Sequence, residues 1–153
     1  MKIEERIKEL GIELPNAAAP AAMYVPTKVT GNLLFVSGQI PVKNGEMVYT
    51  GKAGEDRTLE EAQAAARLCA INIVSALKAE LGDLDKVKSI VKITAFVASK
   101  TGFDKQHLVA NGASELLFEV FGEAGRHTRS AVSVNQLPLD ATVEVEAIVE
   151  IEK

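Results

Sequence analysis

The chain has 153 residues, of which 47% are hydrophobic and 25% charged, and its formal net charge is −4. This length and composition are typical of one globular domain with a sizeable core. The acidic balance argues against nucleic acid as a partner, because nucleic acid is usually held by a basic surface.

The N-terminus is charged, "MKIEERIKELG", and lacks the apolar segment of a signal peptide. Nowhere do 18 apolar residues follow one another, so we expect neither a membrane-spanning segment nor a membrane partner. The single cysteine, Cys69, cannot form an internal disulfide, which is typical of a reducing compartment. The sequence therefore predicts a cytoplasmic protein.

A short helix is the first predicted element. It is indicated by apolar residues at helical spacing and a glycine stop: Ile3, Ile7, Leu10 and Gly11. We expect residues 1–16 to form this helix and a linker, and residues 17–153 to form a single domain.

A β-hairpin is predicted next. The segments "VPTKVT" and "LLFVSGQIP" flank Gly31-Asn32, a pair that favours a tight turn. Residues 42–57 are rich in turn-forming residues and are predicted to form a loop.

Two long helices are predicted on either side of a strand. Thr58 and Glu61 form a capping box that begins the first helix, and Gly82 ends it. Its apolar stripe comprises Ala62, Ala65, Ala66, Cys69, Ile73, Ala76 and Leu77. The second helix lies within residues 103–122, and a break near Asn111 and Gly112 is left open.

The strand between the helices lies within residues 87–99. Its alternation places four apolar residues on one face: Val91, Ile93, Ala95 and Val97. Because a helix separates this strand from the first hairpin, a parallel pairing with that hairpin is favoured.

A closing hairpin is the last predicted element. The segments "TRSAVSV" and "VEVEAIVEI" flank Leu-Pro-Leu-Asp and both alternate. If their valine-rich faces meet the core, Arg129 and Glu144 lie together on the second face of the sheet. Arg129 then has two interpretations: a salt bridge to Glu144 or Glu146 across the hairpin, or a guanidinium in a subunit cleft that binds a carboxylate. Periodicity alone favours the salt bridge.

These elements predict an α+β sandwich, in which two long helices cover one face of a mixed sheet. The second face is left uncovered, and its expected occupants are apolar enough to favour self-association. They are Leu33 or Leu34, Phe35 or Val36, Thr94, Phe96, Ala131 and Ile148. His107 and His127 have no third ligand at a metal-binding spacing, so no metal site is predicted.

Three stretches resemble one protein family: "LLFVSGQIP", "ELGDLDKVKSIVKITAFV" and "TRSAVSVNQLPLDATVEVEAI". They are similar to the RidA/YjgF family of reactive-intermediate (enamine/imine) deaminases, in the same order, over residues 17–153. The resemblance implies a chorismate-mutase-like fold and a homotrimer whose sheets pack around a central barrel. It also implies active sites in clefts between subunits.

The resemblance assigns roles to individual residues. Arg129 matches the arginine that binds the substrate carboxylate, and Glu144 matches the glutamate associated with the attacking water. In the substrate-binding set, Gly38 matches the glycine whose backbone faces the ligand, Tyr24 a tyrosine near the linker, and Asn111 a cleft asparagine.

The chain also departs from the family's pattern. Ala131 stands where the family often has a cysteine. The N-terminal helix and the expanded segment of residues 103–127 suggest a divergent branch.

The implied activity is hydrolytic deamination of 2-imino acids and enamines of the 2-aminoacrylate type, giving 2-keto acids and ammonia without a cofactor. The alternative is a non-catalytic trimer that binds a small carboxylate-bearing metabolite. The family also carries an endoribonuclease L-PSP label, and the acidic balance argues against that activity here.

Overall fold

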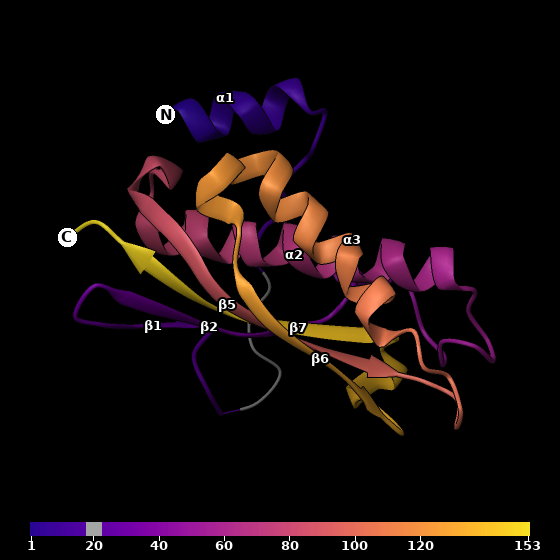
Figure 1. Cartoon of the computed structure of the whole chain (residues 1–153). Coiled ribbons are helices and arrows are strands. Elements are labelled where there is room, and N and C mark those ends of the chain that lie inside the picture. The colour runs from indigo at the N-terminus through magenta and orange to yellow at the C-terminus, as the bar shows by residue number, and fades with distance from the viewer. Residues whose placement is uncertain (18–22) are drawn as a thin grey trace.

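The computed structural model describes residues 1–17 and 23–153. Its main sheet has the strand order β1-β2-β7-β5-β6 (Figure 1). The strands are β1 (Thr27–Thr30), β2 (Leu33–Gln39), β5 (Val87–Ala98), β6 (Thr128–Val134) and β7 (Val143–Ile151). The pairs β1–β2, β2–β7 and β7–β5 are antiparallel, and β5–β6 is parallel, so the sheet is mixed as predicted.

Two long helices, α2 (Leu59–Leu81) and α3 (Gln106–Phe121), cover the same face of this sheet (Figure 1). The shorter α1 (Lys2–Glu9) lies on the outer side of α3. The α+β fold with both long helices on one face is therefore confirmed. Short elements connect the rest: β3 (Val42–Lys43), β4 (Glu46–Met47), η1 (Leu84–Lys86), η2 (Gly122–Gly125) and η3 (Pro138–Asp140). The pair β3–β4 is a small hairpin inside the segment predicted to be a loop.

The predicted closing hairpin is wrong, because β5 lies between β6 and β7. The connection of residues 135–142 crosses the end of β5 and places β7 between β5 and β2. The parallel partner of β5 is β6, which follows the α3 crossover, and the first hairpin pairs with β7 instead. The predicted parallel pairing of β5 with the first hairpin is therefore also wrong.

The register of β6 on β5 decides which of its side chains face the helices. Arg129 pairs with Ile93, and Ala131 pairs with Ala95; both β5 residues are fully buried beneath the helices. Arg129 and Ala131 therefore lie on the helix-covered face, and Val132 is exposed on the other. The prediction that the valine-rich face of β6 meets the core is wrong, because β6 is an edge strand whose orientation is set by β5.

Two register shifts change which side chains of β5 point toward the core. They lie between Val87 and Ser89 and between Ile90 and Lys92. Ile90 is consequently buried, whereas Val91 is 39% exposed, contrary to its predicted place in the core. Ile93, Ala95 and Val97 are buried as predicted.

The second face of the sheet is not covered by any helix of the described residues (Figure 1). Cross-strand pairs place Phe35 beside Ile148 and Phe96 beside Glu144 on this face. Thr94 lies there too, opposite Glu146. The uncovered apolar face is thus as predicted, except that Ala131 packs against the core on the other side.

The two long helices begin and pack for identifiable reasons. The Thr58 hydroxyl accepts from the Glu61 amide at 3.1 Å, and the Thr58 amide donates to the Glu61 carboxylate at 3.0 Å, which confirms the capping box. Helix α3 continues through Gly112 without a break. A Cβ at Gly112 would lie 2.9 Å from the carbonyl carbon of Gln63, so glycine permits the close approach of α3 to α2.

This close approach leads to a prediction about Gly112→Ala. In an exposed helix, alanine is about 1 kcal/mol more favourable than glycine. We expect the opposite sign here, a loss of about 1–3 kcal/mol in the free energy of unfolding, because the added methyl group would overpack the helix contact. Thermal and urea unfolding would measure this loss.

The matched control is Ala79→Gly, at an exposed position of α2, which should show only the ordinary helix-propensity effect. A rise in stability for Gly112→Ala would contradict the packing explanation.

Candidate functional site

Arg129 is held by the helix that covers β6. Its Nη1 donates to Asn111 Oδ1 at 2.9 Å and to Ser114 Oγ at 3.0 Å, and its Nη2 donates to the backbone carbonyl of His107 at 3.0 Å. All three acceptors belong to α3. The predicted salt bridge to Glu144 or Glu146 is therefore wrong, since the guanidinium is directed to the helix layer.

These contacts do not use the whole guanidinium. Arginine carries five N–H groups, and three hydrogen bonds are formed here. Within residues 1–17 and 23–153, the Nε–H group and one further N–H have no acceptor. A guanidinium fixed on one side and unoccupied on the other is suited to a carboxylate ligand.

A groove lies beside Arg129 and has a volume of about 390 Å³. Its lining comprises Ser114, Glu115, Phe118, Gly125, Arg126, His127 and Arg129. Burial lowers the pKa of His127, and the nearby positive charge of Arg129 lowers it further. His127 is therefore neutral at pH 7.

Glu144 lies on the opposite face of the sheet, beside Gly38. An added Cβ at Gly38 would stand 2.7 Å from Cδ of Glu144, so any larger residue would require this carboxylate to move. Burial raises the pKa of Glu144, and the negative charge of Glu146 raises it further. No hydrogen-bond donor from the described parts of the chain reaches this carboxylate, which leaves it available to water or a ligand.

Tyr24 lies in the bend before β1. Its side chain is 51% exposed. The adjoining residues are tied to β2, because Ser37 donates its hydroxyl to the Val25 carbonyl at 2.7 Å and its amide to the Pro26 carbonyl at 2.9 Å. The two residues after Tyr24 are therefore tied to Ser37, the residue before Gly38.

The predicted site residues thus form two separate groups in one chain. We call Arg129, Asn111 and Ala131 the arginine group, and Glu144, Gly38 and Tyr24 the glutamate group. Arg129 pairs with Ile93 and Glu144 with Phe96, three residues further along β5 and on the other face. Ideal sheet spacings put the two Cα atoms roughly 14 Å apart, with side chains diverging. One chain alone does not bring these two side chains onto one ligand.

Sequence reasoning missed Ser114 and the groove beside it. Asn111 and Ser114 are three residues apart on α3 and therefore share a helix face, a signal that could have linked them. Cys69, predicted to be part of the hydrophobic core, is fully buried between α2 and the sheet. Burial raises the pKa of its thiol well above the ordinary value.

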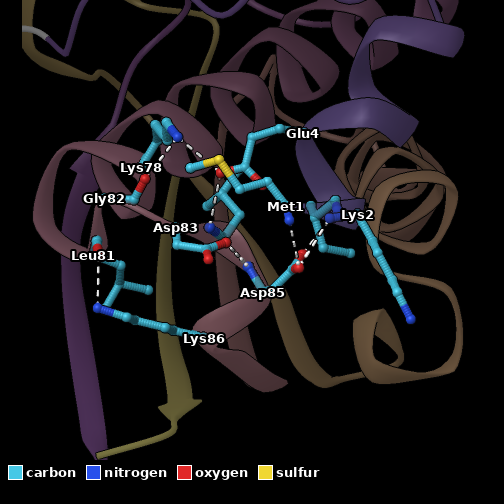
Figure 2. Close-up of polar contacts among 11 residues, drawn as sticks. Met1, Lys2, Glu4, Lys78, Leu81, Gly82, Asp83, Asp85 and Lys86 are labelled. Carbon is cyan, nitrogen blue, oxygen red and sulfur yellow. Dashed lines mark hydrogen bonds and ion pairs between the residues drawn. The ribbon is translucent and has the colours of Figure 1, made fainter.

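One group of carboxylates has the spacing of a metal site: Glu4, Asp83 and Asp85. The Asp85 carboxylate accepts hydrogen bonds from the backbone amides of Lys2 and Ile3, both at 2.9 Å. It also forms an ion pair with the N-terminal amine at 3.1 Å (Figure 2). These amides hold the pKa of Asp85 at about 2, with the amine adding to the effect.

The partners of Glu4 complete this junction. Its carboxylate accepts a hydrogen bond from Lys78 Nζ at 2.8 Å (Figure 2). It accepts a second one from the backbone amide of Leu84 at 3.0 Å. The carboxylates thus fasten α1 to the connection between α2 and β5. None of the helices in the described part of the chain has the length and apolarity to cross a bilayer.

Comparisons with known proteins agree with this fold over nearly its whole length. The family model described as "YjgF/chorismate_mutase-like, putative endoribonuclease" matches residues 4–151. Protein TCP17 of Trypanosoma cruzi is 50% identical over 151 residues, which cover 98% of this chain and 94% of that protein. The crystal structure of Atu1372 from Agrobacterium tumefaciens, a protein of unknown function, is 52% identical, with a TM-score of 0.92 and coverage of 98% and 92%.

A third relative carries a named activity. The 2-iminobutanoate/2-iminopropanoate deaminase of Escherichia coli K12 is 34% identical over 139 residues, which cover 90% of this chain and 94% of the enzyme. The chain belongs to the YjgF/RidA family.

Membership of the YjgF/RidA family identifies the fold as the α+β fold of that family, with its mixed sheet and covering helices. The family includes 2-iminobutanoate/2-iminopropanoate deaminases, which supports a general RidA-type role for this member.

The carboxylate junction of this YjgF/RidA family member leads to a pH-dependent prediction. The folded pKa of Asp85, about 2, is below its unfolded value of about 3.9. Its contribution to stability is therefore fully present above about pH 4 and is lost as the pH falls through about 2. Asp85→Asn should lower the Tm at pH 7, and the difference from wild type should disappear near pH 2.

The control for this test is Asp104→Asn, which removes an exposed carboxylate elsewhere. Melting with and without Ca²⁺ or EDTA would also distinguish a junction from a cation site. A Tm that depends on the cation in wild type but not in Asp85→Asn would contradict the junction.

Proposed function

We propose that the protein is a homotrimer that hydrolyses reactive 2-imino acids, and the enamines in equilibrium with them, to 2-keto acids and ammonia. The arginine group of one chain and the glutamate group of its neighbour would form each site. The observation that carries this proposal is Arg129, anchored by α3 with two N–H groups left for a ligand. The named activity of the relative that is 34% identical supports the substrate class.

Arg129 binds and orients the substrate in this mechanism. Its remaining Nε–H and Nη2–H groups form a planar fork that accepts the two oxygens of a carboxylate. Asn111 and Ser114 already fix the guanidinium, so little side-chain freedom is lost on binding. The carboxylate then places the adjacent C=N carbon at a defined position for attack.

Glu144 acts on the water in this mechanism. Its raised pKa makes the carboxylate a stronger base than an ordinary glutamate, so it can accept a proton from the attacking water. The hydroxide oxygen adds to the imine carbon and the nitrogen takes a proton, giving a carbinolamine. Transfer of the hydroxyl proton to the nitrogen and cleavage of the C–N bond then release ammonia and leave the keto oxygen. Such imines also hydrolyse in water, so a modest acceleration is sufficient, and the steps use no cofactor.

Assembly through the uncovered sheet face would bring the two groups together. Phe35, Phe96 and Ile148 give this face an apolar character that one chain leaves open. In the proposed trimer the sheets pack around a central barrel, and the arginine group at the β6 edge meets a neighbour's glutamate group. Small carboxylate-bearing metabolites are then the ligands. The net charge of −4 disfavours nucleic acid.

A non-catalytic trimer that binds small carboxylates is the alternative. The geometry of Arg129 supports both functions, whereas the unpaired Glu144 carboxylate beside Gly38 favours the enzyme. Keto-acid formation from imines generated by an amino-acid oxidase distinguishes the two.

The first prediction from this mechanism concerns Arg129→Lys. Lysine keeps the positive charge but has no planar fork, so the variant should retain its fold and lose most of its imine hydrolysis. Arg129→Ala should weaken carboxylate binding by on the order of 2–5 kcal/mol if the pair is buried. Hydrolysis, ligand affinity and Tm would be measured on both.

Arg67→Lys is the matched control, because Arg67 forms an ordinary surface ion pair with Glu119 at 3.0 Å. It should leave activity unchanged. Full activity in Arg129→Lys, or a Tm loss large enough to explain the whole effect of Arg129→Ala, would rule out the carboxylate clamp.

The second prediction concerns sites shared between chains. Arg129→Ala and Glu144→Gln should each be nearly inactive, because each lacks one half of every site. Trimers reassembled from an equal mixture should recover about a quarter of wild-type activity, since that share of the interfaces combines an intact Arg129 with an intact Glu144.

Light scattering on the same samples would report the assembly, and reassembled single-variant trimers are the control. A stable monomer at micromolar concentration, or the absence of recovered activity in mixed trimers, would contradict an intersubunit site.

A further inference from the structure

We infer that the groove at the start of β6 receives the side chain of the ligand whose carboxylate Arg129 binds, and that it selects bulky apolar side chains, branched or aromatic. This inference rests on the carboxylate clamp of the proposed function and specifies its substrate class. The clamp and the groove are continuous, because Arg129 and its anchor Ser114 both line the groove.

The size of the groove exceeds what a small imino acid requires. Its volume of about 390 Å³ falls within the range of roughly 300–1,000 Å³ typical of ligand sites. A 2-imino acid with a methyl side chain has six heavy atoms in all and would leave most of this space to water. A branched or aromatic side chain would occupy more of it.

The floor of the groove is apolar. Phe118 is 42% exposed there, although it belongs to the helix that packs on the core. Gly125 contributes backbone to the lining, and a Cβ at that position would stand 2.7 Å from the carbonyl carbon of Leu117. The guanidinium of Arg126 lies over one face of the Phe118 ring, 4.8 Å from its centre, and forms a cation–π contact with it.

The charges around the groove disfavour an acidic side chain. Arg126 is already paired with Glu123, with Nε 3.1 Å from a carboxylate oxygen. Glu115 contributes a negative charge to the lining, and His127 is neutral because burial lowers its pKa. Arg129 is thus the one cation of the lining without a carboxylate partner in the described residues, and the ligand's own carboxylate would occupy it.

Binding of 2-keto acids tests this inference without requiring turnover. The probes are pyruvate, 4-methyl-2-oxopentanoate and phenylpyruvate, which share the carboxylate and differ in the side chain. Calorimetry should show the two larger acids binding about tenfold tighter than pyruvate, as expected when an apolar side chain is buried. Phe118→Ala should remove this preference.

Two further measurements complete the experiment. Val48→Ala truncates another exposed apolar side chain and should preserve the preference. Imines generated by an oxidase from alanine, leucine and phenylalanine should show the same order in kcat/KM, with the preference again lost in Phe118→Ala.

The outcomes separate the two proposals. Binding or turnover of the pyruvate-sized ligands without a preference for larger ones would overturn the groove assignment alone, as would a preference that survives in Phe118→Ala. Failure of all three keto acids to bind, together with no hydrolysis of any imine, would overturn the carboxylate clamp and the groove assignment with it.

Discussion

The pairing of β5 with β6 on one side and β7 on the other determines where every candidate residue of the site lies. It places Arg129 beside Ile93 under the helices and Glu144 beside Phe96 on the uncovered face. The two side chains are separated by a strand and point to opposite faces of the sheet, so they do not meet within one chain. A single chain therefore presents a cation at the sheet edge and a carboxylate on the sheet face. The proposed assembly would bring both groups to one ligand by placing it between two chains.

The helix layer does more than cover the core, because α3 also orients the arginine. Gly112 lets α3 approach α2 closely, and Asn111 and Ser114, on either side of that glycine, both bind Arg129. A shift of α3 caused by a larger residue at the contact would move these acceptors as well. Helix packing and the position of the guanidinium are thus coupled. This coupling explains how a flexible side chain at a sheet edge is held in one orientation.

The sequence predicted features that depend on near neighbours in the chain. The Thr58–Glu61 capping box, the turn at Gly31 and the stop at Gly82 are local, and each was found. Strand partners are not local: the alternation of β6 suits either face, and only its register on β5 directs Arg129 to the helices. The shift near Val91 is likewise invisible in a simple alternation. The sequence therefore identified candidate site residues more readily than it predicted the face of the sheet on which each one lies.

Burial gives Glu144 a property that an exposed strand glutamate lacks. Its pKa is raised chiefly by desolvation, and packing of a second chain over this face would remove still more water from the carboxylate. In the proposed assembly the neighbour's guanidinium opposes this effect until a ligand carboxylate neutralises it. Ligand binding would then raise the basicity of Glu144 at the moment when the water must be deprotonated. In the proposed assembly, the sheet pairing that separates the two groups in one chain would thereby link substrate binding to the basicity of Glu144 across the interface.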